Sequence, residues 1–163
     1  MGDRAKEATS WPPGPWMSVD VGTVRVGVAA TDPDRRLAFP VETIPRDSAT
    51  VERLGALVAE RGAVSVFVGL PITLAGREGV SAEDARALAV ALAQRLDVPV
   101  RLIDERLTTA SAGASLREAG RSERHQRAVI DQAAAVVILE LALDGGRNGI
   151  LDSLAKPVHQ GDS

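Results

Sequence analysis

The chain of 163 residues is long enough for about one domain. Hydrophobic residues make up 45% and charged residues 25%, a balance typical of a globular protein rather than a disordered one. No apolar run reaches the roughly 18 residues that a membrane-spanning helix needs, and the first sixteen residues lack the apolar centre of a signal peptide. The absence of cysteine excludes disulfides and thiolate metal sites, and we expect a cytoplasmic protein.

Charge and aromatic content give no sign of a nucleic-acid partner at the level of the whole chain. The net charge is −3 and only 2% of the residues are aromatic. The sequence therefore shows no global basic field, and so few rings argue against an extended platform of stacking rings. The two histidines, His125 and His159, are too few for a zinc site built from several histidines.

Three regions are predicted along the chain. Residues 1–15 are polar and rich in proline, and are expected to form a disordered arm. Residues 16–146 carry the periodic apolar pattern of a single folded domain. Residues 147–163 are expected to form a C-terminal tail.

The first elements of the domain are predicted to form an antiparallel meander. Residues 16–31 contain two apolar strand patterns, and the Asp-Pro-Asp turn at 32–34 separates them from a further strand at 36–44. Residues 48–61 have helical apolar spacing, and Gly62 is a plausible left-handed residue after that helix.

Strands and helices then alternate. The expected strands are residues 63–70 and 98–103, and the expected helices are residues 81–96, 108–119 and 124–143. A capping box at 81–84 begins the first of these helices, and the glycines at 145–146 end the last. The order predicts an α/β fold with a mixed five-stranded sheet, antiparallel then parallel, flanked by helices.

Asp20 is the first candidate for chemistry, because it interrupts an apolar strand. A buried carboxylate costs several kcal/mol unless it is paired or binds a cation. A turn-capping aspartate at the end of the strand is the alternative.

Two further acidic positions could join Asp20. Asp104 and Glu105 follow the strand at 98–103, at the sheet edge where α/β proteins bind ligands. Neighbouring residues of a strand face opposite sides, so only one of the two can share a site with Asp20 while the strand continues. Asp131 lies at the margin of the apolar stripe of the last helix. An Asp-Glu turn with Arg106 and a solvent-facing Asp131 are the alternatives.

Clustered carboxylates, in a chain without a usable histidine or cysteine, favour a site for hard cations. Oxygen ligands suit Mg²⁺ or Mn²⁺. Two such ions can stabilise the attacking and leaving oxygens of an in-line phosphodiester displacement, which needs no protein nucleophile.

Two segments could contact a substrate. Residues 101–127 hold six arginines against four acidic residues, and Arg121, Arg124 and Arg127 precede Asp131. These arginines are candidates for phosphate contacts, and a solvated helix face is the alternative. Residues 69–79, which include three glycines and Arg77, could form a mobile substrate loop; they contain no Walker A motif.

Four motifs, in order and spacing, resemble the YqgF/RuvX family. They are SVDVGTVRVGVAATDP at 18–33, VGLPITLAGREG at 68–79, DERLTT at 104–109 and VIDQAAAVVILE at 129–140. The resemblance implies an RNase H-like fold. It also implies that Asp20, Glu105 and Asp131 are the catalytic and metal-binding carboxylates. Four further residues fall in the same motifs: Arg25, Arg106, Thr108 and Thr109. The chain departs from the common pattern at Val24, Thr73 and Ala75.

The family implies a metal-dependent endonuclease acting on structured nucleic acid. Its members are described as candidate pre-16S rRNA nucleases in ribosome biogenesis and as candidate Holliday junction resolvases in DNA recombination and repair. The expected partner is pre-rRNA or branched DNA, with no membrane, and the protein is expected to be a monomer or a homodimer. A non-catalytic nucleic-acid-binding protein is an alternative. The Asp-Val-Gly-Thr motif at 20–23 also resembles a phosphate motif of actin-like and sugar-kinase ATPases, but a second such segment is missing.

Overall fold

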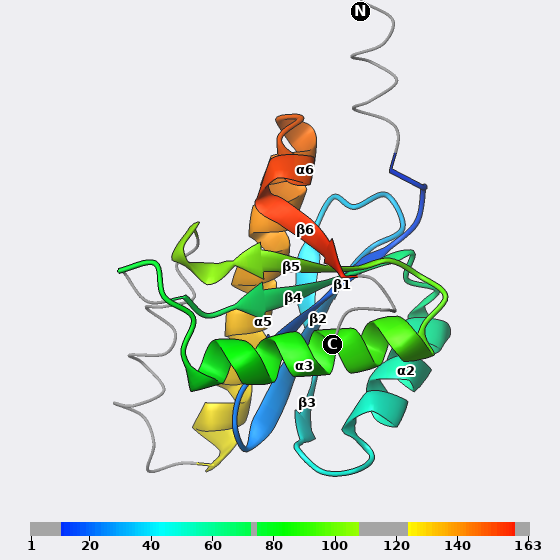
Figure 1. The fold of residues 1–163 in the computed structure, drawn as a ribbon. Helices are drawn as coiled ribbons and strands as arrows, with labels where there is room; N and C mark the ends of the chain where they lie inside the picture. Colours follow the sequence, from blue (N-terminus) through cyan, green and yellow to red (C-terminus); the bar gives the residue numbers. More distant parts are fainter. Residues whose placement is uncertain (1–10, 73–74, 108–123, 159–163) are drawn as a thin grey trace, which may run out of the picture.

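The computed structural model describes residues 11–72, 75–107 and 124–158. Its strands are β1 (Trp16–Val21), β2 (Arg25–Thr31), β3 (Ala38–Pro45), β4 (Ser65–Leu70), β5 (Val100–Asp104) and β6 (Ala155–Val158). Its helices are α2 (Thr50–Arg61), α3 (Val80–Arg95), the 3₁₀ turn η1 (Glu105–Leu107), α5 (Arg124–Arg147) and α6 (Leu151–Leu154). Figure 1 shows a sheet covered by α3 and α2 on one face and by α5 on the other.

The sheet has the order β3-β2-β1-β4-β5-β6, with β1 near its centre. β1 pairs antiparallel with β2 and parallel with β4, which pairs parallel with β5. The predicted α/β class, the meander and the following parallel strands are therefore confirmed. β-branched and small residues dominate these strands, as expected where both faces of a sheet are covered.

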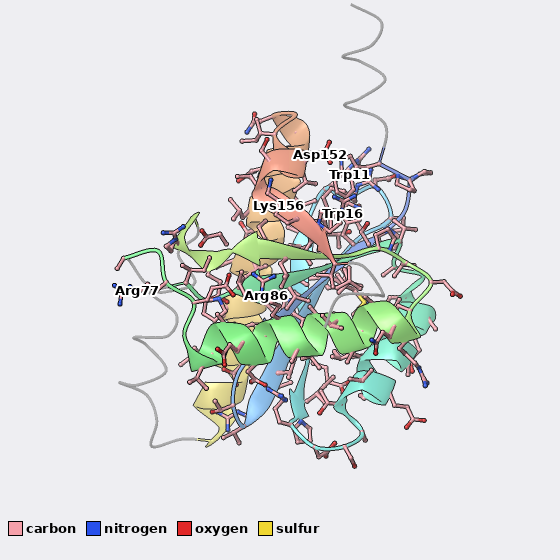
Figure 2. All side chains as sticks on the ribbon, in the orientation of Figure 1. Trp11, Trp16, Arg77, Arg86, Asp152 and Lys156 are labelled. Carbon is pink, nitrogen blue, oxygen red and sulfur yellow. The ribbon has the colours of Figure 1, made fainter. Side chains whose placement is uncertain are left out.

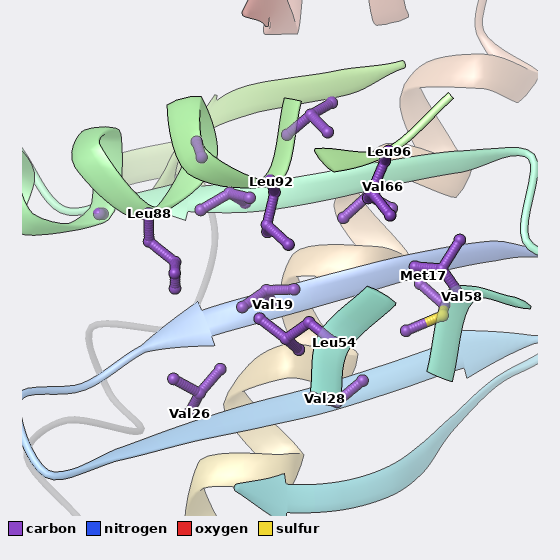
Figure 3. Close-up of a cluster of buried hydrophobic side chains, with 14 of the residues drawn as sticks. Met17, Val19, Val26, Val28, Leu54, Val58, Val66, Leu88, Leu92 and Leu96 are labelled. Atoms are coloured by element: carbon purple, nitrogen blue, oxygen red, sulfur yellow. The ribbon is translucent and has the colours of Figure 1, made fainter. Parts of the chain in front are cut away.

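Side chains that alternate along the strands build two cores. On one face, aliphatic side chains of the strands pack against α2 and α3. Figure 3 shows part of this core: Met17, Val19, Val26, Val28, Leu54, Val58, Val66, Leu88, Leu92 and Leu96. On the other face, Trp16, Phe67 and Ile103 pack against Ile138 and Leu139 of α5. The inner helix α5 is buried over much of its length, which explains its nearly continuous apolar sequence.

The sheet has six strands rather than the predicted five, because part of the expected tail is folded. Residues 151–154 form α6, and β6 pairs antiparallel with β5 at the edge of the sheet. Leu151 and Ala155 are buried in the α5-side core. At the other terminus, Trp11 of the expected arm packs against that same core.

The predicted boundary was right at the C-terminal end of α2, and wrong at the N-terminal end of α3 and the C-terminal end of α5. Gly62 follows α2 in the left-handed conformation, with φ 63°, as predicted. The capping box at 81–84 is not formed: Gly79 is the N-cap of α3, and Asp84 binds Arg46 instead. The glycines at 145–146 do not end α5, which continues to Arg147. The expected helix at 108–119 lies outside the described residues.

Among the residues that the structure describes, no helix is both long and apolar enough to cross a membrane.

Candidate functional site

Asp20 lies near the end of the central strand β1 and is only 5% exposed. Two residues earlier, the hydroxyl of Ser18 donates a hydrogen bond of 2.6 Å to the carbonyl oxygen of Ala135 in α5. Since alternate residues of a strand face the same side, Asp20 also lies on the face that α5 covers. The sequence expectation of a buried carboxylate is confirmed.

Gly27 of β2 brings the last helix next to Asp20. Gly27 is the register partner of Asp20. A Cβ atom built on Gly27 would overlap the carbonyl group of Asp131, so the absence of a side chain permits α5 to lie directly on the strand. Asp131 itself is 6% exposed, which rules out the solvent-facing alternative.

Gly69 of β4 brings Glu105 to the other side of Asp20. Val19 pairs with Val68, so one step further along these parallel strands places Gly69 beside Asp20. A Cβ atom on Gly69 would lie 2.5 Å from Oε1 of Glu105. The Glu105 side chain therefore occupies the space that a side chain at 69 would take.

An ion pair connects β2 to α5 at this edge. Nε of Arg25 donates a hydrogen bond of 3.0 Å to Oδ2 of Asp131, across 106 residues of sequence. The Arg25 side chain is 23% exposed and that of Asp131 8%, so the pair is largely shielded from water. Breaking such a pair leaves an uncompensated charge, which makes the contact a strong constraint on geometry.

Asp104 is turned away from this group. Its carboxylate binds Arg106, with Nη2 of Arg106 at 2.7 Å and Nε at 3.0 Å from Oδ2. Hydrogen bonds from the Arg106 side chain are the main reason that the pKa of Asp104 is lowered. Leu102, two residues earlier, belongs to the core of the opposite face. The expectation that Asp104 and Glu105 face different sides is confirmed.

The expected substrate-binding residues lie around the same sheet edge where they are described. Arg77 is exposed in the loop after β4. Nη1 of Arg106 lies 3.6 Å from the position of a Cβ on Gly76, so Arg106 and this loop are neighbours. Arg124 and Arg127 lie in the first turn of α5, and their side chains are outside the described part. Thr108, Thr109 and Arg121 lie outside the described residues altogether.

The donor chemistry suits a hard cation, but the described side chains do not form a complete ligand set. Asp20, Glu105 and Asp131 offer only carboxylate oxygens, the ligands preferred by Mg²⁺ and Mn²⁺. Within residues 11–72, 75–107 and 124–158, no three or more acidic, histidine or cysteine side chains form a group that could hold a metal. One oxygen of Asp131 is engaged by Arg25.

Sequence reasoning missed the two glycines that flank Asp20. Gly27 and Gly69 each sit inside a strand, where glycine is unfavourable and often marks a close approach of another segment. That signal was present in the sequence. The pairing of Arg25 with Asp131 had no local signal, because it depends on how α5 lies on the sheet.

Comparison with known proteins identifies the family of the chain. The model of the RuvX family, described as Holliday junction resolvase, matches residues 14–145. The chain belongs to the RuvX family. RuvX relatives at about 60% identity carry the name "Putative pre-16S rRNA nuclease". One from Mycolicibacterium paratuberculosis is 59% identical over 134 residues, covering 80% of both chains. One from Mycobacterium tuberculosis is 60% identical over 131 residues, covering 78% of this chain and 77% of the relative.

The RuvX chain also shares its fold with a solved structure of RuvC. The structure titled "T. thermophilus RuvC in complex with Holliday junction substrate" superposes with a TM-score of 0.54 at 16% identity. The match covers 89% of this chain and 99% of that one. The expected RNase H-like architecture is thereby confirmed.

Proposed function

We propose that the protein is a metal-dependent endonuclease that cleaves phosphodiester bonds in pre-16S rRNA during 5′-end processing. The names of the RuvX relatives at 58–60% identity support the RNA substrate. We place this activity in the cytoplasm, in a monomer or a homodimer.

The observation that carries the proposal is the placement of Asp20 between two glycines. The missing side chain of Gly27 leaves room for the backbone of Asp131, and that of Gly69 leaves room for the carboxylate of Glu105. A purely structural aspartate at a strand end would not need glycines on both neighbouring strands to let Asp131 and Glu105 approach. This placement supports the proposal that the three carboxylates form the catalytic group.

The same residues are proposed to hold Mg²⁺ or Mn²⁺. Such an ion supplies Lewis-acid polarisation of the phosphate and lowers the pKa of a bound water. Asp20, fixed in the central strand, provides a rigid ligand, and Glu105 begins a short 3₁₀ turn that aims its side chain over Gly69. Arg25 neutralises Asp131 and orients its carboxylate.

The positive side chains at this edge are proposed to contact substrate phosphates. Arg77, Arg106, Arg124 and Arg127 belong to segments that border the carboxylates, and Thr108, Thr109 and Arg121 follow or precede them in sequence. Arginine suits this task because its guanidinium forms paired hydrogen bonds with phosphate oxygens.

The test compares two labelled substrates, a 5′-extended fragment of 16S rRNA and a four-way DNA junction, with Mg²⁺ or Mn²⁺ and with EDTA. We expect the wild-type protein to cut the RNA only with a divalent ion. Asp20→Asn and Glu105→Gln should each lower the rate by at least about 100-fold, because each removes a charged oxygen ligand. Asp104→Asn is the matched control and should retain most activity, since Asp104 faces Arg106.

The stability of the Asp20→Asn variant separates a catalytic role of Asp20 from a structural one. Asp20→Asn should keep the melting temperature of the wild type or raise it, because the substitution removes a buried charge. An unfolded Asp20→Asn variant would identify Asp20 as a structural residue. Binding without cleavage under every ionic condition would leave a non-catalytic nucleic-acid-binding protein.

A Holliday junction resolvase is the second candidate. It is favoured by the description of the matching family model and by the fold shared with T. thermophilus RuvC. Cleavage of the junction but not of the RNA fragment would select it, with the same carboxylates in the same role.

A further inference from the structure

A pocket lies at the end of the sheet opposite the carboxylates. Its volume is about 400 Å³, the size of a small-ligand site. The start of β1, the turn after β2 and the C-terminal end of α5 line it. Its aromatic and charged lining consists of Trp11, Trp16, Asp34, Arg35, Arg36 and Arg147.

Three of the four aromatic residues of the chain gather here. The rings of Trp11 and Trp16 are 5.3 Å apart, and those of Trp16 and Phe67 are 5.0 Å apart. Figure 2 shows Trp11 and Trp16 together, on the other side of the view from Arg77 in the loop of the catalytic edge. Trp16 is buried, while Trp11 is half-buried and lines the pocket.

Arg35 forms part of the wall in an unusual backbone conformation. Its φ of 56° is in the left-handed region that residues other than glycine rarely adopt. Its guanidinium carbon lies 4.7 Å from the centroid of Trp16, and Nη1 donates to the carbonyl oxygens of Pro12 and Gly14 at 2.8 Å. Arg35 thus holds the segment that presents Trp11.

Packing of the N-terminal segment explains Trp11, Trp16 and Arg35, but not the other two arginines. Arg36 is exposed, and its side chain forms no ion pair with any described residue. Arg147 is exposed too and shares its charge with Asp144 at 3.1 Å. With Asp34 as the acidic member of the lining, the pocket carries a net positive charge.

We infer that this pocket binds one nucleotide of a single-stranded nucleic acid, with the base against Trp11 and the phosphate near Arg36 and Arg147. A tryptophan ring beside arginines combines base stacking with phosphate attraction, the two interactions that hold single strands. The pocket is large enough for one unstacked nucleotide and too small for a duplex. The inference rests on the proposed function in one respect: the bound strand is an unpaired end of the nuclease's own substrate.

Tryptophan fluorescence provides the test, because the only two tryptophans of the chain both line this pocket. The wild-type protein in EDTA, which prevents cleavage, is titrated with a uridine hexanucleotide, a thymidine hexanucleotide and inorganic phosphate. We expect saturable quenching by an oligonucleotide and none by phosphate at the same concentration.

Variants assign the quenching to the pocket. The double variant Arg36→Ala/Arg147→Ala should bind about tenfold more weakly, and its slope of log affinity against log salt should fall by roughly one to two. The matched control, Arg61→Ala/Arg95→Ala, removes the same charge from α2 and α3 on the other side of the sheet, and should bind like the wild type.

Three results would overturn the inference. They are the absence of quenching by either oligonucleotide, equal weakening in both double variants, and quenching by phosphate alone. The RNA and DNA arms identify which strand the pocket prefers. Binding is measured without cleavage, so a protein that quenches but never cuts would refute the proposed function and leave the pocket assigned.

Discussion

Gly69 controls how closely Glu105 approaches Asp20, so its substitution should affect chemistry more than folding. In Gly69→Ala the new Cβ would meet Oε1 of Glu105 and Cδ1 of Ile138, both at 2.5 Å. Both are ends of flexible side chains that can move. We expect a loss of about 1–3 kcal/mol in the free energy of unfolding, typical of overpacking, and a cleavage rate at least about tenfold lower because the carboxylate is displaced. Urea unfolding and single-turnover cleavage measure the two effects; unchanged cleavage would mean that Glu105 is not catalytic.

Gly27→Ala should instead weaken the fold itself. Its Cβ would overlap the backbone of Asp131, which cannot move without shifting α5. We expect the free energy of unfolding to fall by at least about 3 kcal/mol, the upper part of the range for overpacking. Gly55→Ala in α2 is the control: its nearest neighbours would be 3.7 Å away, and the change should stabilise the helix by roughly 0.5–1 kcal/mol. A loss of less than about 1 kcal/mol in the free energy of unfolding of Gly27→Ala would show that α5 does not pack directly on β2.

At the scale of elements, a bidentate salt bridge connects the end of β3 to α3. Nη1 and Nη2 of Arg46 bind the two oxygens of Asp84 at 2.7 and 2.9 Å, and Nη1 also donates to the carbonyl oxygen of Gly22. These hydrogen bonds lower the pKa of Asp84 below its ordinary value of 3.8. The bridge therefore ties the turn after β1 to a helix that covers the sheet.

Asp84→Asn should destabilise the protein by about 1 kcal/mol, as expected for a partly exposed pair with good geometry. Because the pKa of Asp84 is lower in the folded state, the stabilisation is present above pH 3.8 and is lost as the pH falls through the lowered pKa. Urea unfolding at pH 7 and at pH 3 measures this difference between wild type and variant. A difference that stays constant or grows at pH 3 would contradict the assigned ion pair.

At the scale of the whole molecule, substrate binding should depend on the arginines that precede Asp131 in the sequence. Replacing Arg121, Arg124 and Arg127 with alanine should weaken binding to all sequences alike. The slope of log affinity against log salt should fall by roughly one unit for each phosphate that the variant no longer neutralises. Cleavage at saturating substrate should persist, because the carboxylates are untouched. An unchanged slope would indicate that the phosphates are bound elsewhere, by Arg25, Arg77 and Arg106.

The sequence predicted those parts of the fold whose signals are local. Alternation and a strong turn delimited β1 and β2, and Gly62 marked the end of α2. Strand β6 was missed because its four residues, Ala155–Val158, include a lysine and a proline and show no alternating pattern. Pairing with β5 makes it a strand, and that information lies elsewhere in the chain.

In the candidate site, too, the features with a local sequence signal were predicted and those that depend on distant contacts were not. The interruption of an apolar pattern was enough to select Asp20 and Asp131, both now seen to be buried. Strand alternation indicated that only one of Asp104 and Glu105 could share a site with Asp20, and the family resemblance selected Glu105. The contact between Arg25 and Asp131 could not be predicted, because it joins β2 to α5 only once the helix is laid across the sheet.

Helix α5 extends without a break from the sheet edge that carries Asp20 to the aromatic pocket. At 1.5 Å per residue, the stretch from Asp131 to Arg147 is about 24 Å long, a length that several nucleotides of an unpaired strand would span. If one strand is held at both ends, the helix acts as a ruler that sets how far the cut bond lies from the held nucleotide. Shortening α5 by one turn would then move the cut by one or two nucleotides.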